Sequence, residues 1–272
     1  MSEEHDFIGE VANQSNNVID KAYDDLVHPT AKSIGNTLSL LPRTIGIWFS
    51  GWEKWIINGE ESIRLTAKAV KEKAEKISEE KLTRPELYVA VPAIQQLSYC
   101  YDSMELRELY ANLLVSSMNI DTKNSVHPSF VYIIKQLTPD EAKLLKIISE
   151  GKGVFPLIDL HINAPENNGY NIKIRYFSNI SEGVCDYPEL ISSYIDNFVR
   201  LGIIEILPFE NLTNEALYTP LENHPKIRKI MEEPLSEGYY YETIRRVFRV
   251  TALGWNFIKT CVSTETDNSK NG

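Results

Sequence analysis

Apolar residues recur three or four positions apart through much of the first 137 residues, with mostly polar residues between them. This period is typical of helices that bury one face. Shorter apolar runs replace it further on, as in VFPLIDLHI (154–162) and YNIKIRYF (170–177), and these runs indicate strands. We therefore expect no strand before Thr138 and strands only from Val154 onwards.

Several expected helices have recognisable starts. Asp102 is followed three residues later by Glu105, and Thr138 by Glu141, which is the spacing of a capping box. Proline fits the first turn of a helix, so another helix is expected to begin near Pro92. In the helix that follows Asp102, leucines line the apolar face, and Asn112 is expected to lie off that face with the charged residues.

A narrow apolar stripe precedes these helices. Its members alternate in steps of four and three residues: Ile34, Leu38, Leu41, Ile45, Trp48, Trp52 and Trp55. We interpret the stripe as one face of a helix packed on its neighbours. The alternative is an amphipathic helix whose Trp48, Trp52 and Trp55 form a contact surface for a membrane or a partner. Charged residues interrupt the run, which disfavours a transmembrane span.

The C-terminal half has a different order of elements. A helix from Thr138 precedes the two strands, and a second helix, Pro188–Leu201, precedes a third strand, IIEIL. After a long connection, Pro208–Ile244, the run TIRRVFRV is expected to pair with IIEIL, and Thr251 to cap a last helix. This order is that of a winged helix, with the helix after Pro188 in the recognition position.

The predicted fold class is therefore mainly α. We expect a helical domain over residues 1–137, a winged-helix-like α+β domain over 138–262, and a disordered tail over 263–272.

Charge argues against binding to nucleic acid. The chain has a formal net charge of −10 and a pI near 5.1, which disfavours DNA and anionic membranes. The expected recognition helix also carries two acids for its one arginine on its polar side. The weak nucleic-acid candidates are Arg245, Arg246 and Arg249, the only basic cluster nearby.

The search for chemistry finds no known catalytic pattern: the sequence lacks HExxH, a P-loop, GxGxxG and GxSxG. Three scattered cysteines indicate neither a zinc site nor a disulfide framework. We expect no enzymatic activity, no cofactor and no metal. The acidic N-terminus lacks the apolar segment of a signal peptide, so the expected location is the cytoplasm, with the inner membrane surface as the alternative.

Three consecutive segments carry a family resemblance: ELYVAVPAIQQLSY, ELRELYANLLVSSMN and HPSFVYIIKQLTPDEAKLLKII. Together they resemble the Abi-alpha family, whose bacterial members are associated with abortive infection. The resemblance covers about residues 28–148, with the winged-helix-like part as an extension. It implies a role in defence against bacteriophage, in which an infected cell stops phage propagation at a cost to itself. The family offers no catalytic residues to transfer.

The expected function is anti-phage defence through contacts with a protein or a membrane surface. A protein partner or a second copy of the chain is the expected ligand, and a phage component is a further candidate. The alternative is a winged-helix regulator that binds nucleic acid.

Overall fold

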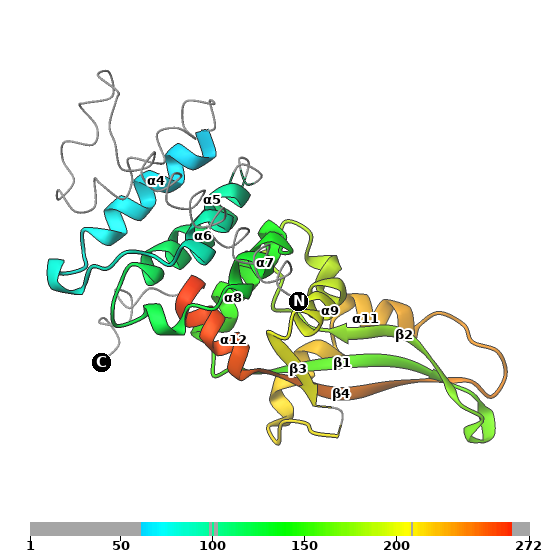
Figure 1. Ribbon diagram of the computed structural model, residues 1–272. Coiled ribbons are helices and arrows are strands. Elements are labelled where there is room, and N and C mark those ends of the chain that lie inside the picture. Colours follow the sequence, from blue (N-terminus) through cyan, green and yellow to red (C-terminus); the bar gives the residue numbers. More distant parts are fainter. Residues whose placement is uncertain (1–60, 98–99, 101–102, 208, 263–272) are drawn as a thin grey trace, which may run out of the picture.

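A computed structural model describes residues 61–97, 100, 103–207 and 209–262 (Figure 1). The tryptophan stripe and the expected tail, 263–272, lie outside these residues. Helices gather at one end of the described molecule, and a sheet extends from them towards the other end. One continuous set of buried apolar side chains includes residues of both parts.

The helical part contains five successive helices and the last helix of the described chain. They are α4 (Glu61–Ala74), α5 (Leu87–Leu97), α6 (Met104–Ser117), α7 (Ser129–Lys135), α8 (Pro139–Glu150) and α12 (Ala252–Phe257), which continues as a π-helical turn, Ile258–Val262. Helix α6 lies at the centre, where Tyr110, Leu113 and Leu114 are fully buried. Because neighbours surround it, α6 buries far more than one face.

Asn112 shows the consequence of this central position. It was expected off the apolar face of α6, but it is buried, and its amide donates to the carbonyl of Cys261 at 2.9 Å. Ser116, one turn further, donates to the carbonyl of Thr260 at 2.9 Å. The expectation failed because it assumed a helix with one solvated side. These two bonds attach the C-terminal turn to α6.

The observed starts of the helices agree only in part with those predicted from the sequence. Thr138 and Glu141 form the expected capping box of α8, with Pro139 at its first position. Helix α6 has Ser103 as its N-cap, one residue after the expected Asp102, and its hydroxyl accepts from Leu106 N–H. Helix α5 begins at Leu87 and contains Pro92, which was expected at its start.

Four strands form one antiparallel sheet in the order β2-β1-β4-β3. They are β1 (Val154–Asn163), β2 (Tyr170–Phe177), β3 (Ile204–Leu207) and β4 (Tyr240–Val250). The first strand begins at Val154 as predicted, and β3 pairs with β4 as predicted, with Ile204 opposite Val250. Before Thr138, the described residues contain one isolated bridge, Leu82 to Asn119, and no strand.

The protein is α+β, and the predicted class, mainly α with a winged-helix-like C-terminal part, is wrong. The four strands belong to a single sheet with β1 between β2 and β4, and β4 alone spans 11 residues. The apolar runs underestimated the length of the strands, because β1 and β4 include polar residues as well. Strand β1 continues to Asn163, and β4 begins at Tyr240.

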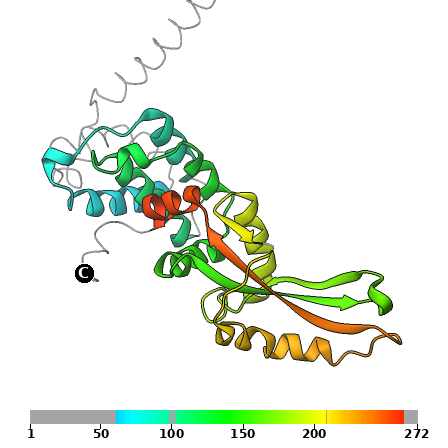
Figure 2. The ribbon, with the colours of Figure 1, turned by 90° about the horizontal axis from the view of Figure 1, so that it is seen from below.

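Three further helices accompany the sheet: α9 (Ile191–Arg200), α10 (Thr219–Glu222) and α11 (Pro225–Met231). Helix α11 runs along one side of the sheet (Figure 2). Short 3₁₀ turns occur at Glu79–Lys81, Lys123–Ser125, Pro165–Asn167, Pro188–Leu190 and Glu215–Leu217.

Helix α9, the expected recognition helix, uses its polar side chains within the protein. Asn197 donates to Glu141 Oε1 at 2.7 Å, and Arg200 donates to the Gln136 side chain at 2.8 Å. Ser192 donates to the carbonyl of Arg175 on β2 at 2.6 Å. These contacts fix α9 between α8 and the sheet.

Candidate functional site

The three arginines that the sequence offered for nucleic acid do not form a patch. Side chains alternate along β4, so Arg246 points to the face opposite that of Arg245 and Arg249. Each has a carboxylate partner: Arg245 Nε lies 2.7 Å from Glu222, Arg246 Nε 3.1 Å from Asp159, and Arg249 Nε 2.6 Å from Glu205. Their positive charges are therefore compensated by carboxylates of the same chain.

Asp159 is the most deeply placed of these carboxylates, with 2% of its surface exposed. One oxygen accepts from the backbone N–H of Tyr176 at 2.8 Å, and the other faces Arg246. Tyr176 has a left-handed backbone, φ 54°, where the register between β1 and β2 shifts. Both oxygens of Asp159 are thus engaged in holding a β-bulge and an ion pair.

His161 lies two residues further along β1 and is 4% exposed. Its ring stacks on Tyr170, with centroids 4.3 Å apart and planes inclined by 7°. Nε2 lies 3.9 Å from Asp159 Oδ2 and has no hydrogen-bond partner among the described residues. Burial lowers the pKa of His161 and outweighs the opposing attraction of Asp159, so the ring is neutral at pH 7.

Cys185 is the half-buried one of the three free thiols. Burial, together with the negative charge of Asp140, raises the pKa of Cys185 to about 11. The thiol therefore stays protonated at neutral pH, whereas a nucleophilic cysteine requires a lowered pKa.

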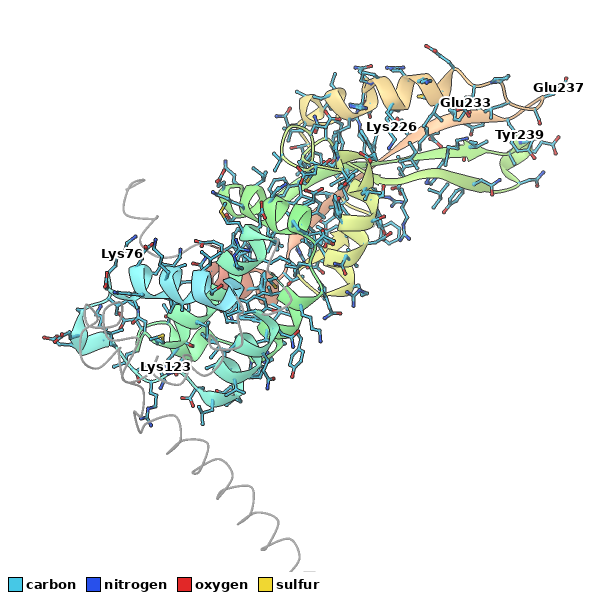
Figure 3. All side chains as sticks on the ribbon, turned by 90° about the horizontal axis from the view of Figure 1, so that it is seen from above. Lys76, Lys123, Lys226, Glu233, Glu237 and Tyr239 are labelled. Atoms are coloured by element: carbon cyan, nitrogen blue, oxygen red, sulfur yellow. The ribbon has the colours of Figure 1, made fainter. Side chains whose placement is uncertain are left out.

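The sheet extends away from the helical part (Figure 1), and side chains near the far ends of its strands are exposed. Tyr170 is 58% exposed, Tyr240 51%, Ile172 47% and Tyr239 41%. The two loops that close this end meet where Gly238, at φ 81°, lies against Pro165. Figure 3 shows Glu237 and Tyr239 at the extremity.

We name residues 162–173 and 232–242 the distal sheet end. It holds five glutamates, Glu166, Glu232, Glu233, Glu237 and Glu242, against Lys173 alone, a net charge of −4. Lys173 pairs with Glu233 at 3.1 Å, and Asn163 donates to Glu242 at 2.7 Å. Exposed tyrosines of this density are typical of protein-binding surfaces. The distal sheet end is the candidate functional site.

Sequence reasoning missed this surface because its parts lie in separate segments. Tyr170 and Tyr240 come to lie on either side of Asn163 only because both pair with it on β1. The available signal was a tyrosine at the start of YNIKIRYF and three more before Glu242. The other proposed contact residues, Trp48, Trp52 and Trp55, lie outside the described residues.

The sequence matches the family model for abortive infection alpha over residues 58–261. The chain belongs to the abortive infection alpha family. Membership indicates an abortive-infection-type protein. The family match extends through the sheet, whereas the resemblance expected from the sequence ended near residue 148.

No curated protein matches the chain in sequence. One solved structure that resembles it is an uncharacterized protein from the hydrocarbon-degrading marine bacterium Alcanivorax borkumensis SK2. The two are 21% identical, and the match covers 47% of this chain and 91% of that one with a TM-score of 0.35. None of the helices in the described ranges is both long and apolar enough to cross a bilayer.

Proposed function

We propose that this abortive infection alpha protein acts in phage defence by binding another protein, without catalysing a reaction. The observation that carries the proposal is the distal sheet end, which extends away from the helical part and carries exposed tyrosines and a net charge of −4. A surface of this composition suits protein recognition, because tyrosine offers a large contact area and a hydrogen-bonding group with few rotatable bonds.

The polar groups nearer the helices support the same proposal. Asp159 and Arg246 bind each other, and Asp159 also holds the bulge at Tyr176. Arg245 and Arg249 pair with glutamates on neighbouring elements. These groups serve the fold. Nothing in their arrangement favours the alternative of a nucleic-acid-binding regulator, since the arginines present no common basic surface.

The proposal is tested by infecting bacteria that carry the gene, or an empty vector, with a panel of phages. We expect fewer plaques on cells that carry the gene. At high phage dose these cells should die without releasing progeny, whereas at low dose the culture should survive. Equal plaque counts across the panel, or individual cells that survive infection at high dose, would contradict an abortive mechanism.

A further inference from the structure

Among the residues that the structure describes, strand β2 is an edge of the sheet. The edge is open at the start of the strand, whereas α9 contacts it at Arg175. In the order β2-β1-β4-β3 it pairs with β1 alone among the described strands, and its residues Tyr170 to Lys173 are all exposed. Seen from above and below, β1 and β2 extend as a hairpin past the helices (Figures 2 and 3). An exposed strand edge presents unpaired N–H and C=O groups, which can pair with another chain.

The ladder shows which groups of β2 point outwards. Ala164 N–H donates to the carbonyl of Gly169 at 2.9 Å, so these two residues form a hydrogen-bonded pair across the hairpin. Hydrogen-bonded and non-bonded pairs alternate in an antiparallel ladder. Tyr170, opposite Asn163, and Ile172, opposite His161, are therefore non-bonded pairs. Their backbone N–H and C=O groups point away from β1, and their side chains are about half exposed.

The negative charge at the Tyr170 end of this edge favours one kind of occupant, although β2 itself carries Lys173 and Arg175. The distal sheet end has a net charge of −4, and Glu166, Glu232 and Glu237 have no ion-pair partner among the described residues. Carboxylates beside exposed tyrosine rings favour cationic side chains, through ion pairs and through cation–π contacts.

We propose that the edge of β2 at Tyr170 and Ile172 binds an extended protein segment rich in lysine or arginine, which adds as a fifth strand. This inference rests on the proposed function and specifies the chemistry of the protein that is bound. Main-chain hydrogen bonds to Tyr170 and Ile172 hold the segment, and the glutamates select its basic side chains. The negative charge disfavours a nucleic acid or an anionic membrane at this edge. A second copy, with its own net charge of −10, is disfavoured for the same reason.

The first arm of the test uses a fluorescein-labelled octapeptide of alternating valine and lysine, titrated with the full chain in a fluorescence-anisotropy assay. Two control peptides separate the contribution of charge from that of main-chain pairing. One replaces lysine with glutamate, and the other carries N-methyl groups on alternate backbone nitrogens, which prevents strand pairing without changing charge. We expect binding of the first peptide and a loss of at least about tenfold in affinity for each control.

The second arm changes the protein. Ile172→Pro removes an outward N–H and leaves the ladder with β1 intact, as proline is tolerated at a strand edge. Ile172→Val keeps the N–H and serves as its control. The double variant Glu166→Lys/Glu237→Lys makes the net charge of the distal sheet end more positive. The double variant Glu79→Lys/Glu80→Lys changes the net charge of the chain by the same amount, but at the helical end. We expect Ile172→Pro and the distal pair to lose peptide affinity about tenfold, and both controls to bind like wild type.

Four results would overturn the inference. Two concern the peptides: the valine–lysine peptide does not bind, or the N-methylated or glutamate peptide binds equally well. The third is an equal loss of affinity in both double charge variants, and the fourth is a dimer in sedimentation that Ile172→Pro dissociates. The last would place a second copy at the edge. Thermal melts of each variant show whether it is folded. Because the assay needs no phage, its failure is distinguishable from failure of the proposed function, which the plaque assay measures.

Discussion

Asp140 offers the sharpest test of how the helices are joined to the sheet. It lies in the first turn of α8 and is 4% exposed. Its carboxylate accepts from the backbone N–H groups of Asp186 and Tyr187 at 2.9 Å each, and from the Tyr194 hydroxyl at 3.0 Å. Lys143 lies 3.2 Å from it. One side chain thereby binds the loop that leads into α9 and α9 itself.

Asp140→Ala removes the acceptor and leaves several donors without a partner. Each buried donor left unpaired costs about 1–3 kcal/mol, and loss of one member of a buried ion pair about 3–5 kcal/mol. Lys143 keeps a partner in Asp186 at 2.8 Å, so the full ion-pair cost does not apply. The three donors that lose Asp140 are expected to cost about 3–5 kcal/mol together, near the low end of their range because Asp186 and Tyr187 are exposed residues. For a chain of this size that corresponds to a fall in Tm of about 6–20 °C.

The pH dependence gives an independent check. Burial by itself raises the pKa of Asp140, but the hydrogen bonds from Asp186, Tyr187, Tyr194 and Lys143 outweigh it and lower that pKa. A lowered folded-state pKa contributes stability above the unfolded value of about 3.9, and this stability is lost as the pH falls through the folded pKa. Wild type should therefore lose this part of its stability below about pH 4, and Asp140→Ala should lack it.

The assay is urea unfolding followed by circular dichroism at pH 7 and at several acidic values. Tyr194→Phe is the matched control: it removes one donor, keeps the ring, and should lower the free energy of unfolding by only about 1–2 kcal/mol. An Asp140→Ala protein whose stability at pH 7 is within experimental error of wild type would refute the reasoning.

Three other substitutions test the packing. Asn112→Ala should lower the free energy of unfolding by about 1–3 kcal/mol, because the carbonyl of Cys261 loses its buried donor; urea unfolding measures this, and an unchanged midpoint would contradict it. Gly254→Ala should destabilise strongly, because a Cβ there would overlap the carbonyl of Ile203; a Tm equal to wild type would show that α12 can shift. Wild type should lose stability as the pH falls below about 6.5, because protonating a histidine with a lowered folded-state pKa costs free energy of folding. His161→Phe should abolish this loss. Melts between pH 5 and 7.5 test it, and equal slopes would contradict it.

The sequence predicted those elements whose stability is local. The capping box at Thr138 and the first strand residue Val154 were readable from short segments. The pairing of β3 with β4 is not local, and it was predicted from two separate apolar runs. Pro92 was misassigned because the propensity of one residue was weighed above the packing of α5, in which Ala93 and Leu97 are fully buried. Tertiary packing overrides such local preferences.

The candidate site was beyond prediction because it depends on the order of the strands. The pairing of Asn163 with both Tyr170 and Tyr240 unites two segments that are 70 residues apart. The partners of Arg245, Arg246 and Arg249 likewise come from distant elements, so a basic run in the sequence became three separate ion pairs. Charge patterns identify candidates, but only the fold decides which charges remain uncompensated.

The most direct test of the account compares wild type, Ile172→Pro and Ile172→Val in the phage assay, at matched protein levels. We expect wild type and Ile172→Val to reduce plaque numbers, and Ile172→Pro, although folded, to give as many plaques as the empty vector. Full protection by Ile172→Pro would show that the edge of β2 is not the surface through which this protein acts.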